Sequence, residues 1–329
     1  MKTARVNAFG GVDGLQIVER EKPVPREGEV LIRVVACGLN YSDVMQREGL
    51  YPGGPKPPYF PGVEAAGIVE AVGPATAGSI AGGARVAVVV RGGAHAEYVA
   101  ANERACIPLP DAVSFVEGAA FPVQCLTAYH ALLTLAHAVE GETVLVHAAG
   151  GGVGTVAVQI ARLLGLCVVG TASTPEKRAR ILELGADRAV GYEDFEQAAR
   201  ELTGGRGPDI VLETVGGDVL RRSLALMPPL ARLVVIGVAS RDAQPIDTLK
   251  LLFRSHAVLG FHLNAIFERE ELVKPSVTQL LSWIVEGQLK LQIGHTLRLS
   301  DIGKAHELLS SRQSYGKIVL RVEGNEEDH

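Results

Sequence analysis

The sequence has few cysteines, little net charge and no long apolar run, and each of these absences excludes a class of protein. No hydrophobic stretch approaches the roughly 18 residues that a membrane-spanning helix needs. The 329 residues carry a formal net charge of −5, so the chain lacks the basic surplus of a nucleic-acid-binding protein. The first eight residues contain no apolar segment of a signal peptide. We therefore expect a cytoplasmic protein with no nucleic-acid partner and no membrane span.

The cysteines and histidines are too scattered for a metal site. A four-cysteine zinc lobe is excluded because no two cysteines form a C-x-x-C pair (Cys37, Cys106, Cys125 and Cys167). Reduced thiols in a reducing compartment are favoured instead. The nine histidines also lack the spacing of metal ligands. We expect no bound metal.

The segment Thr143–Ser173 has the pattern of a strand, a turn, a helix and a second strand. A short apolar run precedes a glycine cluster, and apolar residues at helical spacing follow it. The cluster, 149–154, reads AGGGVG and fits a dinucleotide fingerprint whose first glycine is replaced by alanine. Gly151 would let the backbone approach a pyrophosphate, and Gly154 would let the helix pack closely on the strand. The alternative is a tight turn that binds nothing.

The end of the second strand favours NADPH over NADH. Proteins that bind an unphosphorylated ribose place Asp or Glu about 20 residues after the glycines. No acidic residue occurs from Thr155 to Pro175, and Ser173 and Lys177 instead offer a hydroxyl and a cation to a 2′-phosphate. The alternative is that Lys177 and Arg178 are only a solvated helix face.

Strand and helix patterns alternate from residue 143 to about residue 263, which predicts a doubly wound parallel sheet. Its predicted strands are 143–148, 167–171, 188–192, 209–214, 232–238 and 258–263. The first hundred or so residues are rich in strands, among them 29–36, 64–72 and 85–90. Helices are predicted at 270–286 and 301–311, and a last strand at 316–322. That strand lies beyond the alternating region, so we expect it to return to the first domain.

Five motifs together resemble a known family over essentially the full length. They are CGLNYSD at 37–43, PGVEAAG at 61–67, LTAY at 126–129, HAAGGGVG at 147–154 and GKIVL at 316–320. The chain resembles the zinc-free, zeta-crystallin-like quinone oxidoreductase branch of the medium-chain dehydrogenase/reductase superfamily. It is also similar to the enoyl reductase domains of polyketide synthases and to the vesicle amine transport protein group.

The resemblance implies an α/β fold with two domains. A GroES-like, partly open β-barrel would be formed by residues 1–121 together with 266–329. A Rossmann doubly wound sheet, residues 122–265, would bind NADPH, with the nicotinamide in a cleft between the domains. The resemblance further implies a homodimer that pairs edge strands near Val258 to Leu263.

The resemblance also implies the site residues. Asn40 would face the nicotinamide and the substrate, although a turn asparagine bonded to its own backbone is the alternative. Tyr41, Met45, Tyr51 and His130 would line the substrate pocket. The cofactor would be bound by residues along the whole chain: Thr127, Gly151, Gly152, Val153, Ser173, Lys177, Tyr192, Gly237, Val238, Phe261, His262, Leu263, Arg312 and Lys317.

Two departures from related enzymes bear on the chemistry. Asn40 and Val63 stand where the zinc-dependent relatives carry ligands, so no Lewis acid is expected. Met45 and His130 replace aromatic residues found near the substrate in many quinone oxidoreductases, which leaves the proton donor unidentified. We take Cys37 and Cys125 as small buried residues rather than nucleophiles.

These features predict an NADPH-dependent reductase that transfers hydride to quinones or α,β-unsaturated carbonyl compounds without zinc. Such electron-poor acceptors need no metal, because positioning in a dry site supplies most of the catalysis. Two alternatives stay open: an enoyl-thioester reductase of a biosynthetic pathway, and a non-catalytic NADPH-binding protein.

Overall fold

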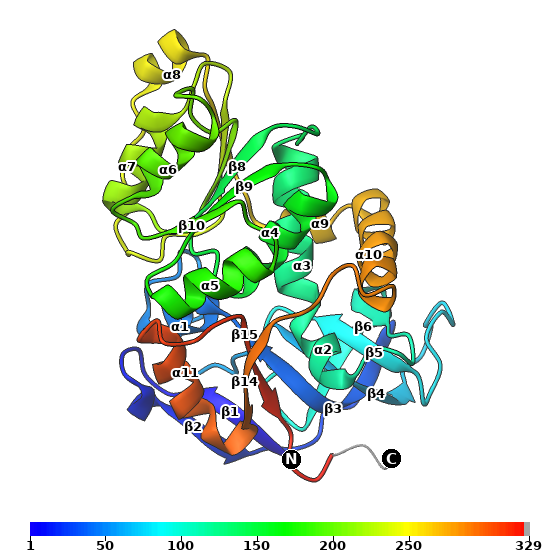
Figure 1. Ribbon diagram of the computed structural model, residues 1–329. Helices are drawn as coiled ribbons and strands as arrows, with labels where there is room; N and C mark the ends of the chain where they lie inside the picture. The colour runs from blue at the N-terminus through cyan, green and yellow to red at the C-terminus, as the bar shows by residue number, and fades with distance from the viewer. Residues whose placement is uncertain (326–329) are drawn as a thin grey trace. The chain divides into compact units, whose positions relative to one another are not determined.

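The computed structural model describes residues 1–325 (Figure 1). Its internal contacts divide the chain into two units. The first contains Met1–Val123 and the chain from Ile293 onward, and the second contains Gln124–Gln292. The C-terminal part of the discontinuous first unit therefore begins at Ile293, whereas the sequence predicts that it begins at residue 266. The intervening helices belong to the second unit, where the side-chain amide of Gln159 pairs with the backbone of Lys290 at 2.9 and 3.0 Å.

The first unit is built on a seven-stranded sheet and a separate antiparallel pair. The sheet order is β14-β15-β3-β4-β5-β7, and β6 also pairs with β3. The pair consists of β1 (Lys2–Val6) and β2 (Leu15–Glu19). The sheet strands are β3 (Glu29–Leu39), β4 (Glu64–Val72), β5 (Arg85–Val89), β6 (Tyr98–Asn102), β7 (Cys106–Pro108), β14 (Ile293–Arg298) and β15 (Lys317–Arg321).

The C-terminal strand returns to this sheet, as the sequence predicts. β15 pairs antiparallel with the end of β3, with Ile318 opposite Leu39. In Figure 1 the red β15 accordingly lies beside the blue β3. β14 pairs in parallel with β15 and has no counterpart among the predicted strands. Its residues are all partly or fully exposed, so it lacks the continuous apolar pattern that marks a buried strand.

The helices of the first unit pack on this sheet or, in the case of the first of them, against another helix. They are α1 (Tyr41–Glu48), α2 (Phe115–Ala120) and α11 (Ile302–Ser310), with short 3₁₀ turns at Val12–Gly14, Glu103–Ala105 and Leu299–Asp301. α1 starts directly after β3, with Asn40 as N-cap, and ends at Gly49, whose φ of 76° suits glycine. α2 lies so close to β3 that a Cβ on Gly38 would be 2.5 Å from the carbonyl oxygen of Ala119. Gly38 therefore permits the packing that brings α2 against the end of β3.

The second unit contains a six-stranded, entirely parallel sheet in the order β10-β9-β8-β11-β12-β13. In chain order this is the 3-2-1-4-5-6 arrangement of a Rossmann fold. The strands are β8 (Thr143–Val146), β9 (Cys167–Thr171), β10 (Arg188–Val190), β11 (Ile210–Glu213), β12 (Arg232–Val235) and β13 (Ala257–Gly260). The predicted doubly wound sheet is confirmed. Several strands end earlier than predicted, because the chain leaves the ladder to form the turns that carry the candidate site.

Helices flank this sheet: Figure 1 shows α4 and α5 on one side and α6 and α7 on the other. The helices of the chain from residue 122 to 285 are α3 (Pro122–Tyr129), α4 (Gly152–Leu163), α5 (Pro175–Glu183), α6 (Phe195–Leu202), α7 (Gly217–Leu226), α8 (Thr248–Arg254), α9 (Leu263–Phe267) and α10 (Glu270–Val285). A π-helix, His130–Leu135, extends α3. In the described part of the chain, no helix has the length and apolarity needed to cross a membrane.

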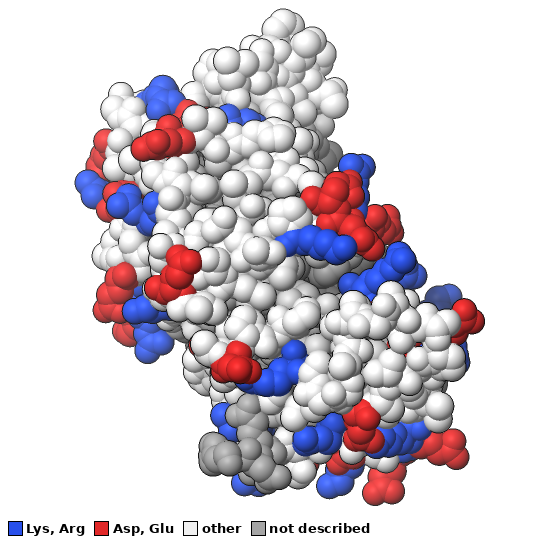
Figure 2. Space-filling view, turned by 90° about the vertical axis from the view of Figure 1, so that its right-hand side faces the viewer, with Lys and Arg blue, Asp and Glu red and all other residues white. Residues whose placement is uncertain are grey.

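The surface charges are mixed in sign. On the face drawn in Figure 2, basic and acidic side chains stand next to one another in small groups, separated by uncharged surface. This distribution agrees with the small net charge of the sequence, and the face shown offers no broad basic footprint for a polyanion.

Candidate functional site

The glycine-rich turn after β8 has the backbone geometry of a phosphate-binding loop. A Cβ on Gly154 would lie 2.4 Å from the carbonyl oxygen of Ala148, so only glycine lets α4 pack this closely. A Cβ on Gly151 would meet only that same oxygen, at 3.3 Å, which leaves the other face of the turn open. Gly151 caps α4, whose first-turn N–H groups have no acceptor within the helix. The residues present therefore fit a dinucleotide pyrophosphate.

Lys177 lies against this turn. A Cβ on Gly150 would be 3.4 Å from both Cβ and Cδ of Lys177, so the aliphatic stem of the lysine covers the first glycine. Burial of this stem lowers the pKa of Lys177 from its ordinary value. The side chain is thus half-buried beside the glycine turn, unlike the neighbouring exposed residues Pro175 and Glu176. Ser173, the other predicted phosphate contact, is exposed just beyond β9.

The remaining predicted cofactor residues of the second unit are mostly gathered at one edge of the sheet. Because all six strands are parallel, their carboxyl ends share an edge, where ligands of this fold bind. The residues that follow β10, β12 and β13 at this edge are Tyr192, Gly237, Val238, Phe261, His262 and Leu263. Thr127 is buried in α3. Arg312 and Lys317 belong to the first unit.

A buried histidine supports this edge. His147 follows β8 directly, and its ring nitrogens pair with the hydroxyls of Thr171 at 3.1 Å and Ser223 at 2.8 Å. Burial lowers the pKa of His147 to about 3, so the ring is neutral at physiological pH. The ring of Tyr192 stacks beside it, with centroids 6.2 Å apart. His147 therefore ties the end of β8 to the end of β9 and to α7, a role that its place in the sequence motif does not reveal.

In the first unit, the half-buried Asn40 forms a polar group with the buried side chains of Glu64 and Lys317. Lys317 Nζ donates to Asn40 Oδ1 at 2.6 Å and also to Glu64 Oε1, and Asn40 Nδ2 donates to Glu64 Oε1 at 2.8 Å. The second Glu64 oxygen accepts the backbone N–H of Val123 at 2.9 Å. Glu64 is fully buried and Lys317 is 3% exposed. The sequence motif retains Glu64 without indicating its partner, since Lys317 is 253 residues away.

These contacts determine the orientation of the Asn40 amide. An ammonium only donates and a carboxylate only accepts, so the amide oxygen faces Lys317 and the amide nitrogen faces Glu64. The Asn40 backbone N–H is held by Asp43 Oδ2 at 2.8 Å. One side-chain N–H of Asn40 is left with no acceptor among the described residues. The arrangement presents a fixed hydrogen-bond donor at the residue that also caps α1.

The predicted substrate-pocket residues lie in two different environments. Tyr41, Met45 and Tyr51 are half-buried on or just after α1, near Asn40 in the chain. Burial, followed by the charge of Asp43, raises the pKa of Tyr51. His130 is only 1% exposed, and its nitrogens pair with Thr134 Oγ1 at 2.7 Å and Ser276 Oγ at 3.1 Å.

His130 therefore ties the π-helix to α10. Burial lowers its pKa to about 4, so the ring is neutral at physiological pH. Both ring nitrogens are engaged by Thr134 and Ser276, so neither is available to a substrate.

Sequence reasoning missed Gln124, which lies in α3 one turn before Thr127 and directly after Val123. Its side chain is 1% exposed, and neither amide atom has a hydrogen-bond partner among the described residues. A glutamine at a helix start gives no signal of this in the sequence. Buried amides are almost always paired. The amide of Gln124 therefore either binds a ligand or lowers the stability of the fold.

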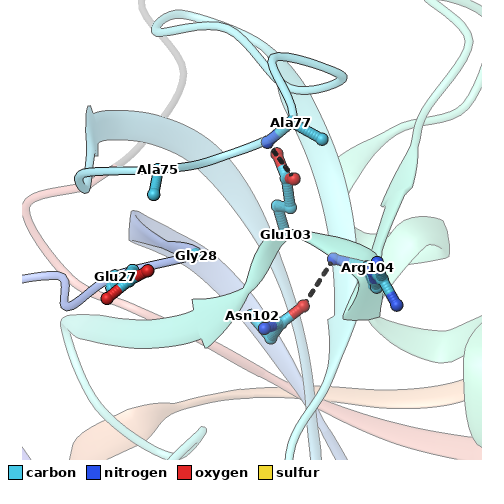
Figure 3. A pocket seen from close by; sticks show the side chains of 7 residues that line it. All are labelled: Glu27, Gly28, Ala75, Ala77, Asn102, Glu103 and Arg104. Carbon is cyan, nitrogen blue, oxygen red and sulfur yellow. Dashed lines mark hydrogen bonds between the residues drawn. The ribbon is translucent and has the colours of Figure 1, made fainter.

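An open surface hollow of the first unit lies among Glu27, Gly28, Ala75, Ala77, Asn102, Glu103 and Arg104 (Figure 3). Its polar groups already serve the local fold: Glu103 accepts from the Ala77 amide, and Asn102 accepts from the Arg104 amide at 3.0 Å. We assign no chemistry to it. Among residues 1–325, no three His, Cys, Asp or Glu side chains are arranged to hold a metal ion.

A Rossmann sheet combined with a GroES-like sheet defines the class of protein. Residues 26–111 match the alcohol dehydrogenase GroES-like domain, and residues 152–283 match the zinc-binding dehydrogenase family. The chain belongs to the medium-chain dehydrogenase/reductase superfamily and, within it, to the quinone oxidoreductase group. The predicted resemblance is thereby confirmed.

Individual relatives agree with this assignment. Quinone oxidoreductase of Homo sapiens is 33% identical over 97% of both chains. The synaptic vesicle membrane protein VAT-1 homologue of Danio rerio is 33% identical over 98% of this chain and 70% of its own length.

Two solved structures are similar over 98% of this chain and the whole of theirs. They are Escherichia coli quinone oxidoreductase complexed with NADPH (TM-score 0.92, 32% identity) and the quinone oxidoreductase of Thermus thermophilus, solved also with NADPH (TM-score 0.87, 40% identity).

Proposed function

We propose that this protein is an NADPH-dependent reductase that transfers hydride to quinones or α,β-unsaturated carbonyl compounds without zinc. The observation that carries the proposal is the oriented amide of Asn40, held by a buried cation and a buried carboxylate. A donor fixed in this way can bind an acceptor oxygen as negative charge develops on it.

In this proposal NADPH is held by the carboxyl edge of the second unit. The open turn at Gly151 and the first-turn amides of α4 bind the pyrophosphate, and Lys177 with Ser173 binds the 2′-phosphate. The related Escherichia coli and Thermus thermophilus enzymes were solved with this cofactor. NADPH supplies the hydride, and the protein supplies binding and orientation.

The first unit would bind the acceptor oxygen through the second N–H of Asn40. Glu64 and Lys317 keep the amide from flipping, because reversal would place the amide NH₂ against an ammonium and the amide oxygen against a carboxylate. The buried ion pair also places positive charge beside the amide oxygen, which polarises the amide and strengthens its donor. A conjugated acceptor is already electrophilic, so this chemistry needs no metal.

The decisive experiment measures NADPH oxidation with matched panels of quinones, enones and enoyl thioesters, together with elemental analysis for zinc. The proposal predicts turnover of quinones or enones by zinc-free protein that is unaffected by chelators. Preference for enoyl thioesters would assign the protein to a biosynthetic pathway. Tight NADPH binding without turnover of any acceptor would favour a non-catalytic role, which the similarity to the VAT-1 homologue makes worth testing.

A variant tests the role of Asn40. Asn40→Ala should lower turnover by about 2- to 13-fold or more, the equivalent of one lost hydrogen bond, while the dissociation constant of NADPH stays unchanged. Asn325→Ala is a suitable control because Asn325 is also buried in the first unit, where it donates to the carbonyl of Val34 at 2.9 Å. The control should lose stability but not turnover. Equal turnover losses in both variants would refute the assignment.

We further propose a homodimer in the cytoplasm. β13 is an edge strand whose residues are all at least partly exposed, which makes it available to pair with a second copy. All four cysteines are free thiols, as suits a reducing compartment. Light scattering should give twice the chain mass, and Val258→Pro should give the single mass, because proline removes a ladder donor. A monomeric wild type would refute the dimer.

A further inference from the structure

A buried carboxyl group lies at the point of the parallel sheet where the strand order reverses. In the order 3-2-1-4-5-6 this point falls between β8 and β11, and ligands of such sheets bind beside it, outside the carboxyl ends of the strands. Glu213 is the last residue of β11 and is fully buried. Burying a carboxyl group is costly unless it is hydrogen-bonded, so the partners of Glu213 indicate its role.

Glu213 binds the turn that follows its own strand. Its Oε1 accepts the backbone N–H groups of Val215 at 2.5 Å and of Gly216 at 2.8 Å. Gly216 has a φ of 79°, in the left-handed region that residues with a side chain rarely adopt. The two hydrogen bonds therefore hold a turn, residues 214–217, whose backbone conformation also requires glycine.

This turn is bonded to the segment that follows β12. Three backbone hydrogen bonds of 2.7 to 2.9 Å join residues 214–217 to residues 239–242. The shortest runs from the N–H of Ser240 to the carbonyl oxygen of Val215, whose own N–H is held by Glu213. The position of the segment after β12 therefore depends on Glu213 through the backbone of a single turn.

The same turn packs against the two predicted cofactor residues after β12, Gly237 and Val238. A Cβ on Gly216 would lie 2.8 Å from Cγ1 of Val238, and a Cβ on Gly237 would lie 3.5 Å from the carbonyl oxygen of Thr214. Ser173, the predicted 2′-phosphate contact, follows β9 on the other side of the reversal point. A dinucleotide that crosses this point therefore has its adenosine half beside β9 and its nicotinamide half beside β11 and β12.

We propose that Glu213 is a positioning residue for the nicotinamide half of NADPH. Its carboxyl group fixes the turn 214–217, and the turn fixes Gly237 and Val238, against which the nicotinamide half lies. Glu213 acts through these backbone groups and needs no contact of its own with the cofactor. This inference rests on the proposed function only in that NADPH is the ligand, and it concerns binding rather than reduction of an acceptor.

Adenosine 2′,5′-bisphosphate separates the two halves of the cofactor, because it carries the 2′-phosphate but no nicotinamide. Glu213→Leu leaves two N–H groups without their acceptor, so the dissociation constant of NADPH should rise about tenfold or more, while that of the bisphosphate should stay within about twofold. In Glu213→Gln the amide oxygen can still accept both N–H groups, so the affinity for NADPH should be within about threefold of wild type. Isothermal titration calorimetry measures both dissociation constants.

Two further variants separate positioning from general stability. Asp209→Ala is the matched control, because Asp209 precedes the same strand and its Oδ2 accepts the Thr143 N–H at 2.9 Å, at the opposite edge of the sheet. This control should lower thermal stability and neither affinity. Gly216→Ala disturbs the turn while Glu213 is intact, so it should also weaken NADPH binding alone, and it decides the question if Glu213→Leu does not fold.

Equal losses of affinity for NADPH and the bisphosphate in the variants of the turn would overturn the positioning role, as would wild-type NADPH affinity in them. A Glu213→Gln variant that binds NADPH no better than Glu213→Leu would overturn it too. If wild type binds NADPH but reduces no acceptor, the proposed function fails, while the affinities still decide the role of Glu213. A wild type that does not bind NADPH overturns both.

Discussion

Removing the buried ammonium of Lys317 should damage both stability and turnover. In Lys317→Met, Glu64 keeps its bonds from Asn40 and Val123 but loses its only described counter-charge in a fully buried position. Breaking one partner of such a pair costs about 3–5 kcal/mol of unfolding free energy, because the remaining charge is left uncompensated. The Asn40 amide also loses the partner of its oxygen and becomes free to flip, so kcat should fall about tenfold.

The double variant isolates the charge. Adding Glu64→Gln to Lys317→Met removes the stranded carboxylate and should restore part of the lost stability, whereas kcat should stay low. Lys22→Met is the matched control, because it breaks an exposed pair with Glu70 and should cost no more than about 1 kcal/mol.

Urea unfolding followed by far-ultraviolet circular dichroism measures the stability of each variant, and NADPH oxidation measures kcat. Wild-type stability and kcat in Lys317→Met would refute the argument. A double variant no more stable than Lys317→Met would show that the loss is one of packing rather than of charge.

Three further outcomes follow from the second unit and the buried histidines. Lys177→Ala should weaken NADPH binding about 10- to 150-fold and leave NADH binding unchanged, and equal losses of affinity for both would mean that Lys177 is only a solvated helix residue. Gln124→Leu removes two unpaired buried atoms and should raise the unfolding free energy by about 1 kcal/mol, so a fall in thermal stability would show that the amide has a partner. His130, His147 and His306 have folded pKa values of about 4, 3 and 3, below their ordinary value of 6.5. The unfolded chain therefore binds more protons below pH 6.5, and stability present above that pH should be lost between about pH 6.5 and 4 for His130 and between about pH 6.5 and 3 for His147 and His306. Each histidine contributes a slope of up to about 1.4 kcal/mol per pH unit, which urea unfolding at pH 7, 6 and 5 will reveal and which equal stabilities would contradict.

Much of the second unit could be predicted because its signals are local. The apolar run at β8, the glycines and the helical spacing after them all lie within about 20 residues. Parallel strands place their carboxyl ends at one edge, so predicting the strands also predicted that Ser173, Tyr192 and Gly237 share an edge. The π-helix at His130–Leu135 gave no such signal, because its apolar residues also fit an ordinary helix.

The sequence by itself determined the alternation of strands and helices, the glycine turn and the membership of Asn40 in a family motif. Only the tertiary structure decided what holds Asn40 in place. Lys317 lies 277 residues from Asn40 and becomes its neighbour because β15 pairs with the end of β3. Arg47 and His306, 259 residues apart, meet because α11 packs beside α1. Apolar periodicity is a local property of the chain, whereas the partner of a buried polar group depends on which distant strands and helices pack together.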